Sequence, residues 1–172
     1  MPANILDFNS KLPEVIYLDT SFILNFSIEG AKYFDECSFF IRRLVDENVL
    51  CVISNLTLDE FWYGLIRASF MRDHPKDWLD RLRGLSKDYV DLVKRATRDL
   101  ISFSNLIVTE VKTEFTFSAL KYMEKYHLLP RDAMHLSTML SLGIKNIATT
   151  DEDFAKVDGI KVYTCNPKCF RR

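Results

Sequence analysis

The stretch Val15-Ile16-Tyr17-Leu18-Asp19-Thr20-Ser21 decides the expected fold of this 172-residue chain. It begins as an apolar run of strand-forming residues and ends abruptly in an acid and two hydroxyls. The segment that starts at Phe22 has the character of a helix, and Ser21 is well placed to cap it. In an open α/β sheet, ligands bind at the carboxyl ends of the strands, so Asp19 is expected to face a site.

Later apolar runs predict further strands, and the intervals between them predict helices. These runs lie at 49–53, 106–108, 146–150 and 160–163, whereas residues 1–14 are expected to form an irregular lead-in. Apolar residues at helical spacing fill the intervals, including a pair of helices over 56–102. Strands that alternate with helices predict a single α/β domain over residues 1–172 with a mainly parallel sheet. Its core is expected at about 15–164, with a helical extension over about 70–102.

Length and composition are those of an ordinary globular protein, with 48% hydrophobic and 27% charged residues. No apolar run reaches the roughly 18 residues that span a bilayer. The start, Met1-Pro2-Ala3-Asn4, lacks the regions of a signal peptide, so a cytoplasmic protein is expected. Its four cysteines are expected to be structural or incidental, since Cys165-x-x-x-Cys169 has no second pair to complete a zinc site.

Charge is distributed unevenly along the chain. Residues 1–66 carry 4 Lys and Arg against 10 Asp and Glu, a net −6, whereas residues 67–98 carry 9 against 5, a net +4. The basic segment is a candidate surface for a phosphate backbone, with Arg81, Arg83 and Lys87 as candidate contacts. The alternative is a solvated helical face.

Four acids hold comparable positions in the expected fold. Asp19 follows the first strand, Asp151 follows the fourth, and Glu60 lies in the first turns of the helix after the second. Strand ends and the helix starts that follow them share one edge of a parallel sheet. Asp132 precedes its strand, so it reaches this edge only if the N-terminus of its helix approaches the same pocket.

Carboxylates that crowd together repel one another unless one is protonated or a cation joins them. Oxygen ligands suit Mg²⁺ or Mn²⁺, and such an ion can activate water for phosphodiester hydrolysis. A single acid at a helix start is more often a cap or dipole partner, as expected for Asp59 and Asp153. A metal-dependent phosphatase would usually need Asp-x-Asp near the first strand, where this chain has Asp19-Thr20-Ser21.

Four segments resemble the successive motifs of PIN-domain nucleases, and most of all the VapC-type toxins of toxin–antitoxin pairs. They are Leu18-Asp19-Thr20-Ser21, Leu56-Thr57-Leu58-Asp59-Glu60, Leu129-Pro130-Arg131-Asp132-Ala133-Met134-His135 and Ala148-Thr149-Thr150-Asp151-Glu152-Asp153-Phe154. The resemblance runs from about Val15 to Tyr163. It implies a three-layer α/β/α fold with a five-stranded parallel sheet, and RNA cleavage that depends on Mg²⁺ or Mn²⁺.

The resemblance also implies roles for particular residues and partners. The catalytic, metal-binding acids would be Asp19, Glu60, Asp132 and Asp151, with Asp153 as an additional acid of the last motif that can serve as a fifth ligand. The hydroxyls of Thr20, Ser21 and Thr150 would support these ligands. VapC-type proteins commonly form homodimers and are blocked by an antitoxin that enters the acidic groove.

Two departures from a compact toxin leave other functions open. They are the long helical segment over 70–102 and the basic tail over 166–172. The alternatives are a PIN nuclease of RNA processing and a non-catalytic scaffold that binds RNA or protein, although the intact set of acids argues against the scaffold. His135, one turn after Asp132, could orient a ligand, but a buried structural role is favoured. Among the adjacent aromatics of 61–63, one or two are expected to cover a neighbouring helix or a partner.

Overall fold

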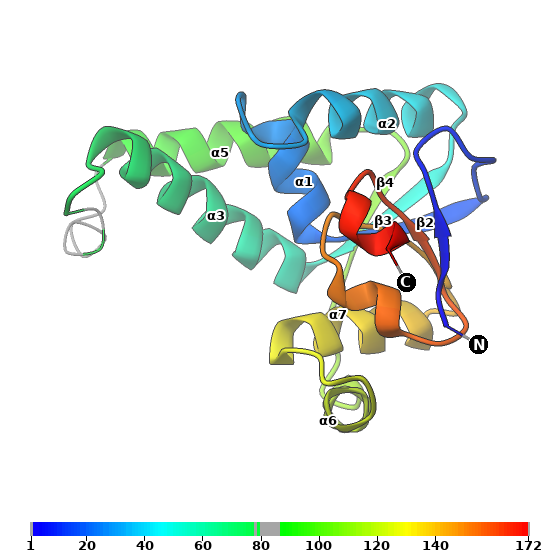
Figure 1. Cartoon of the computed structure of the whole chain (residues 1–172). Helices are drawn as coiled ribbons and strands as arrows, with labels where there is room; N and C mark the ends of the chain where they lie inside the picture. Colours follow the sequence, from blue (N-terminus) through cyan, green and yellow to red (C-terminus); the bar gives the residue numbers. More distant parts are fainter. Residues whose placement is uncertain (1, 78, 80–86, 172) are drawn as a thin grey trace.

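The computed structural model describes residues 2–77, 79 and 87–171 and shows a six-stranded parallel sheet in the order β1-β6-β5-β2-β3-β4 (Figure 1). The strands are β1 (Asn4–Leu6), β2 (Val15–Leu18), β3 (Leu50–Ser54), β4 (Leu106–Thr109), β5 (Asn146–Ala148) and β6 (Lys161–Tyr163). Tyr17 of β2 is paired with Val52 on one side and with Ile147 on the other. The strand that decides the fold therefore lies in the middle of the sheet.

The expectation of five strands and an irregular lead-in over 1–14 is wrong, because β1 adds a sixth strand at one edge. Residues Asn4–Leu6 pair in parallel with Lys161–Tyr163. The N–H of Thr164 also donates to the carbonyl of Leu6 at 2.9 Å. A three-residue strand is too short to show an alternating pattern. Its structure follows from pairing with β6, which the local sequence does not reveal.

Helices cover both faces of the sheet and make three layers, as expected (Figure 1). They are α1 (Thr20–Ser27), α2 (Phe34–Asp46), α3 (Asn55–Asp73), α5 (Lys87–Ile101), α6 (Phe115–Tyr126) and α7 (Pro130–Ser141), with short 3-10 helices η1 (Asp153–Lys156) and η2 (Pro167–Phe170). Helices α1, α2, α3 and α5 lie on one face, and α6, α7 and η1 lie on the other.

Successive strand residues point into two separate cores. Ile16 and Leu18 pack with Phe40 of α2 in the first core. Tyr17 points the other way and packs with Leu136 of α7 in the second. A strand that is covered on both faces needs apolar residues at every position. This is why the strands were visible in the sequence as continuous apolar runs.

The acid of the deciding stretch, rather than its serine, caps α1. The helix begins at Thr20, and the Asp19 carboxylate accepts a hydrogen bond from the Ser21 N–H at 3.3 Å. The prediction that Ser21 is the cap is therefore wrong. Asp and Ser are comparable N-caps, and the Ser21 hydroxyl instead donates to the same carboxylate at 2.6 Å. Helix α7 begins with Pro130 at its first turn, as predicted.

The three adjacent aromatics of α3 have three different environments. Phe61 is fully buried in the first core. Trp62 covers the neighbouring helix α5 and donates from Nε1 to Thr97 Oγ1 at 2.8 Å, whereas Tyr63 is exposed. The expectation that one of them covers a neighbouring helix is confirmed. Within the described residues, α3 and α5 correspond to the expected pair of helices over 56–102, and residues 78 and 80–86 of that segment lie outside the described part of the chain.

The described residues contain no helix that is long and apolar enough to cross a membrane. None of the four cysteines forms a disulfide, and Cys37, Cys51 and Cys169 are buried. None of them belongs to a group of potential metal ligands within the described part of the chain.

Candidate active site

Asp19 lies at the carboxyl end of β2 and is 4% exposed. Its Oδ2 atom accepts short hydrogen bonds from the hydroxyls of Ser21, at 2.6 Å, and Thr149, at 2.7 Å. Thr149 follows β5, the strand that neighbours β2 in the sheet. The carboxylate is therefore held by groups from both sides of the central strand ends.

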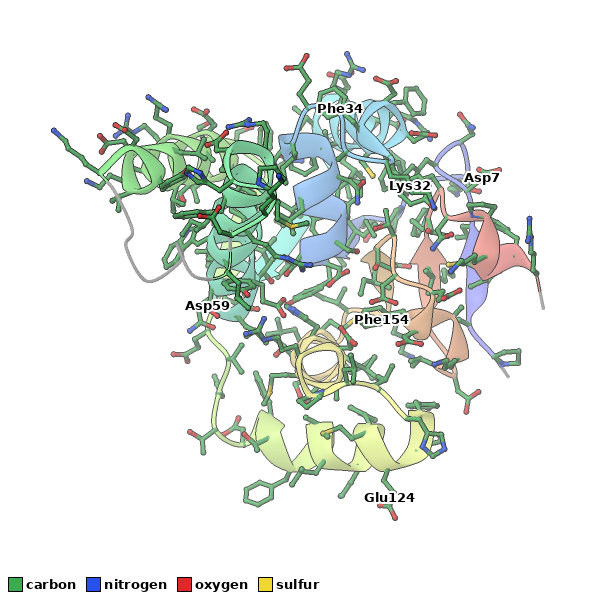
Figure 2. The ribbon with its side chains drawn as sticks, turned by 60° about the vertical axis from the view of Figure 1, so that its left-hand side comes forward. Asp7, Lys32, Phe34, Asp59, Glu124 and Phe154 are labelled. Carbon is green, nitrogen blue, oxygen red and sulfur yellow. The ribbon has the colours of Figure 1, made fainter. Side chains whose placement is uncertain are left out.

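A cluster of three acids lies at the same edge. Asp132, Asp151 and Asp153 each offer a carboxylate oxygen, and these oxygens lie within 4.8 Å of one another. Asp132 is in the first turn of α7, whereas Asp151 and Asp153 belong to the segment that leads from β5 into η1. Figure 2 shows Phe154, next in the chain, beside α7, and both pack in the second core.

Crowding of these acids shifts their protonation. Burial, together with the negative charges of Asp151 and Asp19, raises the pKa of Asp132 to about 7. Burial and the charge of Asp19 also raise the pKa of Asp151, although the backbone N–H of Asp153 lowers it in part. A cation that joined these carboxylates would relieve their repulsion.

Glu60 is held by a different set of partners. Its Oε2 atom accepts a hydrogen bond from Thr20 Oγ1 at 2.7 Å and lies 2.6 Å from His135 Nε2. Its Oε1 atom lies 3.5 Å from Arg131 Nε. Burial raises the pKa of Glu60, but the hydrogen bond and charge of His135, with Thr20 and Arg131, outweigh burial and lower it overall.

His135 connects Glu60 to a buried polar network. Its Nδ1 atom lies 2.8 Å from the hydroxyl of Tyr17, which itself donates to Ser54 Oγ and contacts Thr57. Burial lowers the pKa of His135, but the hydrogen bond to Glu60 and the nearby acids raise it above its usual range. A protonated ring can donate to Tyr17 from Nδ1 and to Glu60 from Nε2. His135 is therefore buried, as expected, and the same hydrogen bonds that hold its ring also orient the carboxylate of Glu60.

The chain also matches a known family, since the family model of the PIN domain matches residues 16–160. The chain belongs to the PIN domain family. Ribonuclease VapC2 of Methanocaldococcus jannaschii is 23% identical to it over 129 residues, which are 74% of this chain and 80% of that protein.

Solved structures share the fold at low sequence identity. Mycobacterium tuberculosis VapC20, described as a toxin that cleaves the sarcin–ricin loop, has a TM-score of 0.54 and 20% identity, and the match covers 81% of this chain and 92% of that one. VapBC2 from Rickettsia felis, bound to a DNA fragment from its promoter, has a TM-score of 0.59 and 15% identity, covering 87% and 98%.

The predicted acids of this PIN domain fall into two groups. Asp132, Asp151 and Asp153 lie together, and Asp19 is close enough to raise the pKa of Asp132 and Asp151. Glu60 lies beside His135 and Arg131 and is outside the three-carboxylate cluster. The same edge of the sheet thus carries a group of acids and, next to it, an acid that is paired with two basic side chains.

The predicted supporting hydroxyls have distinct partners. Thr20 donates to Glu60 and Ser21 donates to Asp19, whereas Thr150 Oγ1 accepts from Asn25 Nδ2 at 3.2 Å. Sequence reasoning missed Thr149, which donates to Asp19 and also accepts from the Asp151 N–H at 2.9 Å. Its position at the end of a predicted strand was the available signal.

The structure describes only part of the basic segment 67–98, which the sequence predicts as a surface for RNA. Arg81 and Arg83 lie outside the described residues, and Lys87 is the first residue of α5. Their contact with RNA stays a prediction. The described PIN domain carries other basic side chains beside its acids, including Arg131 near Glu60 and Lys168, whose Nζ lies 3.3 Å from Glu152.

Tyr17→Phe is expected to destabilise this PIN domain by about 1–3 kcal/mol, because removal of the buried hydroxyl takes away the hydrogen bonds that it makes with Ser54 Oγ and His135 Nδ1. Equilibrium denaturation measures the change. Tyr63→Phe removes the same hydroxyl from a residue that is 47% exposed and should change stability by less than about 0.5 kcal/mol. Equal effects of the two substitutions would show that the buried network is not stabilising.

Proposed function

We propose that this PIN domain is a metal-dependent endoribonuclease that hydrolyses RNA phosphodiester bonds. The observation that carries the proposal is the cluster of Asp132, Asp151 and Asp153, with Asp19 beside it at the carboxyl edge of the sheet. RNA is the favoured substrate because VapC2 is named a ribonuclease and VapC20 is described as a toxin that cleaves the sarcin–ricin loop.

The acids fit a hard divalent cation. Asp132, Asp151 and Asp153 would hold it, and Asp19 would contribute Oδ1, because the hydrogen bonds that it accepts from described residues all end on Oδ2. A site made only of oxygen atoms suits Mg²⁺ or Mn²⁺. Such an ion supplies Lewis-acid charge neutralisation and lowers the pKa of water.

The side chains around the ion would have distinct roles in the reaction. Asp132 would be a ligand of the ion: burial and the charges of Asp151 and Asp19 raise the pKa of its carboxyl group to about 7 when no cation is bound, and a bound cation would lower it. Ser21 and Thr149 hold the carboxylate of Asp19 in one orientation. The proposed catalytic acids are Asp19, Glu60, Asp132 and Asp151, with Glu60 held in place by Thr20 and His135.

We also infer that the protein is the toxin of a VapBC-type pair, that it acts in the cytoplasm as a homodimer, and that residues 1–172 form one domain. The inferred partner is an antitoxin that blocks the acidic edge. Support comes from the fold shared with VapC20 and with the VapBC2 complex of Rickettsia felis.

Cleavage of labelled single-stranded RNA, compared with DNA of the same sequence, tests the activity. We expect cleavage of RNA with Mg²⁺ or Mn²⁺ and none with EDTA. A protein that binds RNA but does not cleave it with either ion would be a non-catalytic scaffold.

Expression in a bacterial host separates a toxin from a processing enzyme. We expect the wild-type chain to arrest growth and Asp151→Asn to leave growth unchanged, because the growth arrest requires RNA cleavage. A wild-type protein that cleaves RNA in vitro but does not slow growth would favour the RNA-processing alternative.

A further inference from the structure

Arg131 presents an unused edge of its guanidinium group beside the acids. Its Nε atom lies 3.5 Å from Glu60 Oε1, and its side chain is 56% exposed. The two terminal nitrogens make no hydrogen bond to any of the residues that the structure describes. We propose that Arg131 binds a phosphate group of the RNA strand through these terminal nitrogens, while Glu60 anchors it through Nε. This inference rests on the proposed nuclease function.

The anchor for Arg131 is itself held firmly. The Glu60 side chain is 13% exposed, and its Oε2 atom is fixed by Thr20 at 2.7 Å and by His135 at 2.6 Å. His135 is in turn fixed by its contact with the Tyr17 hydroxyl. The direction of the remaining oxygen, Oε1, is therefore set before substrate binds. An arginine that pairs with this atom is preorganised, which reduces the entropy lost on binding.

The position of Arg131 in the chain places it beside the proposed metal site. It directly precedes Asp132 in the first turn of α7. The carboxylate of Asp132 lies within 4.8 Å of those of Asp151 and Asp153. A phosphate bound by Arg131 would thus lie next to the acids that are proposed to hold the metal ion.

The negative charge of the site favours a positively charged side chain that holds the RNA strand close to the acids. Asp19, Asp132, Asp151 and Asp153 repel a polyanion, so the strand needs positive groups close to the acids. Lys156 pairs with Asp153, and Lys168 pairs with Glu152, each through a single ammonium group. A guanidinium group differs because it binds a phosphate through two parallel N–H donors.

The competing explanation is that Arg131 makes only a surface ion pair with Glu60. A pair this exposed is worth about 0–1 kcal/mol, so its loss would change stability little and RNA binding not at all. Arg131→Gln removes the positive charge and the two parallel N–H donors of the guanidinium group. Arg42→Gln is the matched control, because Arg42 is exposed on α2, on the other face of the sheet, and among the described residues it donates only to Ser38 O.

Binding is measured by fluorescence anisotropy of a labelled single-stranded RNA with Mn²⁺. All variants carry Asp151→Asn, so that the RNA is not cleaved during the measurement. We expect Arg131→Gln to raise the Kd on the order of tenfold. The slope of log affinity against log salt should fall by about 0.7, the value for one phosphate contact on a single strand. Arg131→Lys should restore part of the affinity, and Arg42→Gln should change neither quantity.

The proposed function and this inference fail in different experiments. Absence of metal-dependent RNA cleavage by the wild-type protein would overturn the nuclease function. Equal RNA affinity and salt slope for Arg131→Gln and Arg42→Gln would overturn the role of Arg131, whether or not the wild type cleaves RNA. A melting temperature within about 3 °C of the parent shows that each variant is folded.

Discussion

Asp151→Asn is expected to lower the rate of metal-dependent RNA cleavage by roughly 10³-fold or more. The amide keeps the shape of the side chain but removes the negative charge that a hard cation needs. A bound metal ion contributes several kcal/mol of transition-state stabilisation, and about 1.4 kcal/mol corresponds to a factor of ten in rate. Asp19→Asn and Asp132→Asn should have effects of the same kind, since both carboxylates lie close to Asp151.

Single-turnover cleavage assays measure these losses, and circular dichroism shows whether each variant is folded. Asp59→Asn is the matched control, because Asp59 precedes Glu60 in the chain but its side chain is exposed (Figure 2). It should cleave RNA at the rate of the wild type. Undiminished cleavage by all three variants of the proposed site would show that the reaction occurs elsewhere.

The metal-free acid cluster is expected to lower the stability of the folded protein as the pH rises. Burial and the charges of Asp151 and Asp19 raise the pKa of Asp132 from 3.8 to about 7. Between these two values the folded state keeps the proton that the unfolded state has lost. Stability therefore falls as the pH rises from about 4 to about 7, and this loss is complete above about pH 7.

Asp132→Asn should consequently stabilise the metal-free protein at about pH 8 while it abolishes cleavage. Because the site is partly open to solvent, which screens the repulsion, we expect a gain of about 1–2 kcal/mol. This corresponds to a rise of roughly 2–6 °C in the melting temperature. Near pH 4, where Asp132 is protonated in the folded wild type, the two proteins should melt at similar temperatures.

Millimolar Mn²⁺ should raise the melting temperature of the wild type, because a ligand that binds only the folded state stabilises it. The rise should be larger at about pH 8 than at about pH 5.5, where metal binding must first displace the proton on Asp132. Asp132→Asn should respond less, and Asp59→Asn should respond as the wild type does. A flat response to Mn²⁺, or an Asp132→Asn variant that is less stable at pH 8, would contradict a strained metal site.

The sequence by itself determined the central strand and the position of Asp19 at its end, and it placed Asp151 in the segment that follows β5, although β5 ends at Ala148 rather than at residue 150. These features depend on short stretches, because a strand covered on both faces needs a continuous apolar run and the chain turns where that run ends. The acid motifs also pointed to the PIN family, which the match over residues 16–160 confirms. The assignment of ligands within the site stays a prediction.

Only the tertiary structure decided which acids lie together and which are paired with basic groups. Asp132 reaches Asp151 because α7 packs on the sheet with its first turn at the carboxyl edge. Glu60 and His135 meet across 75 positions of the chain, and β1 exists only because β6 pairs with it. Such contacts depend on how helices and strands pack in space, and no local periodicity or capping pattern encodes them.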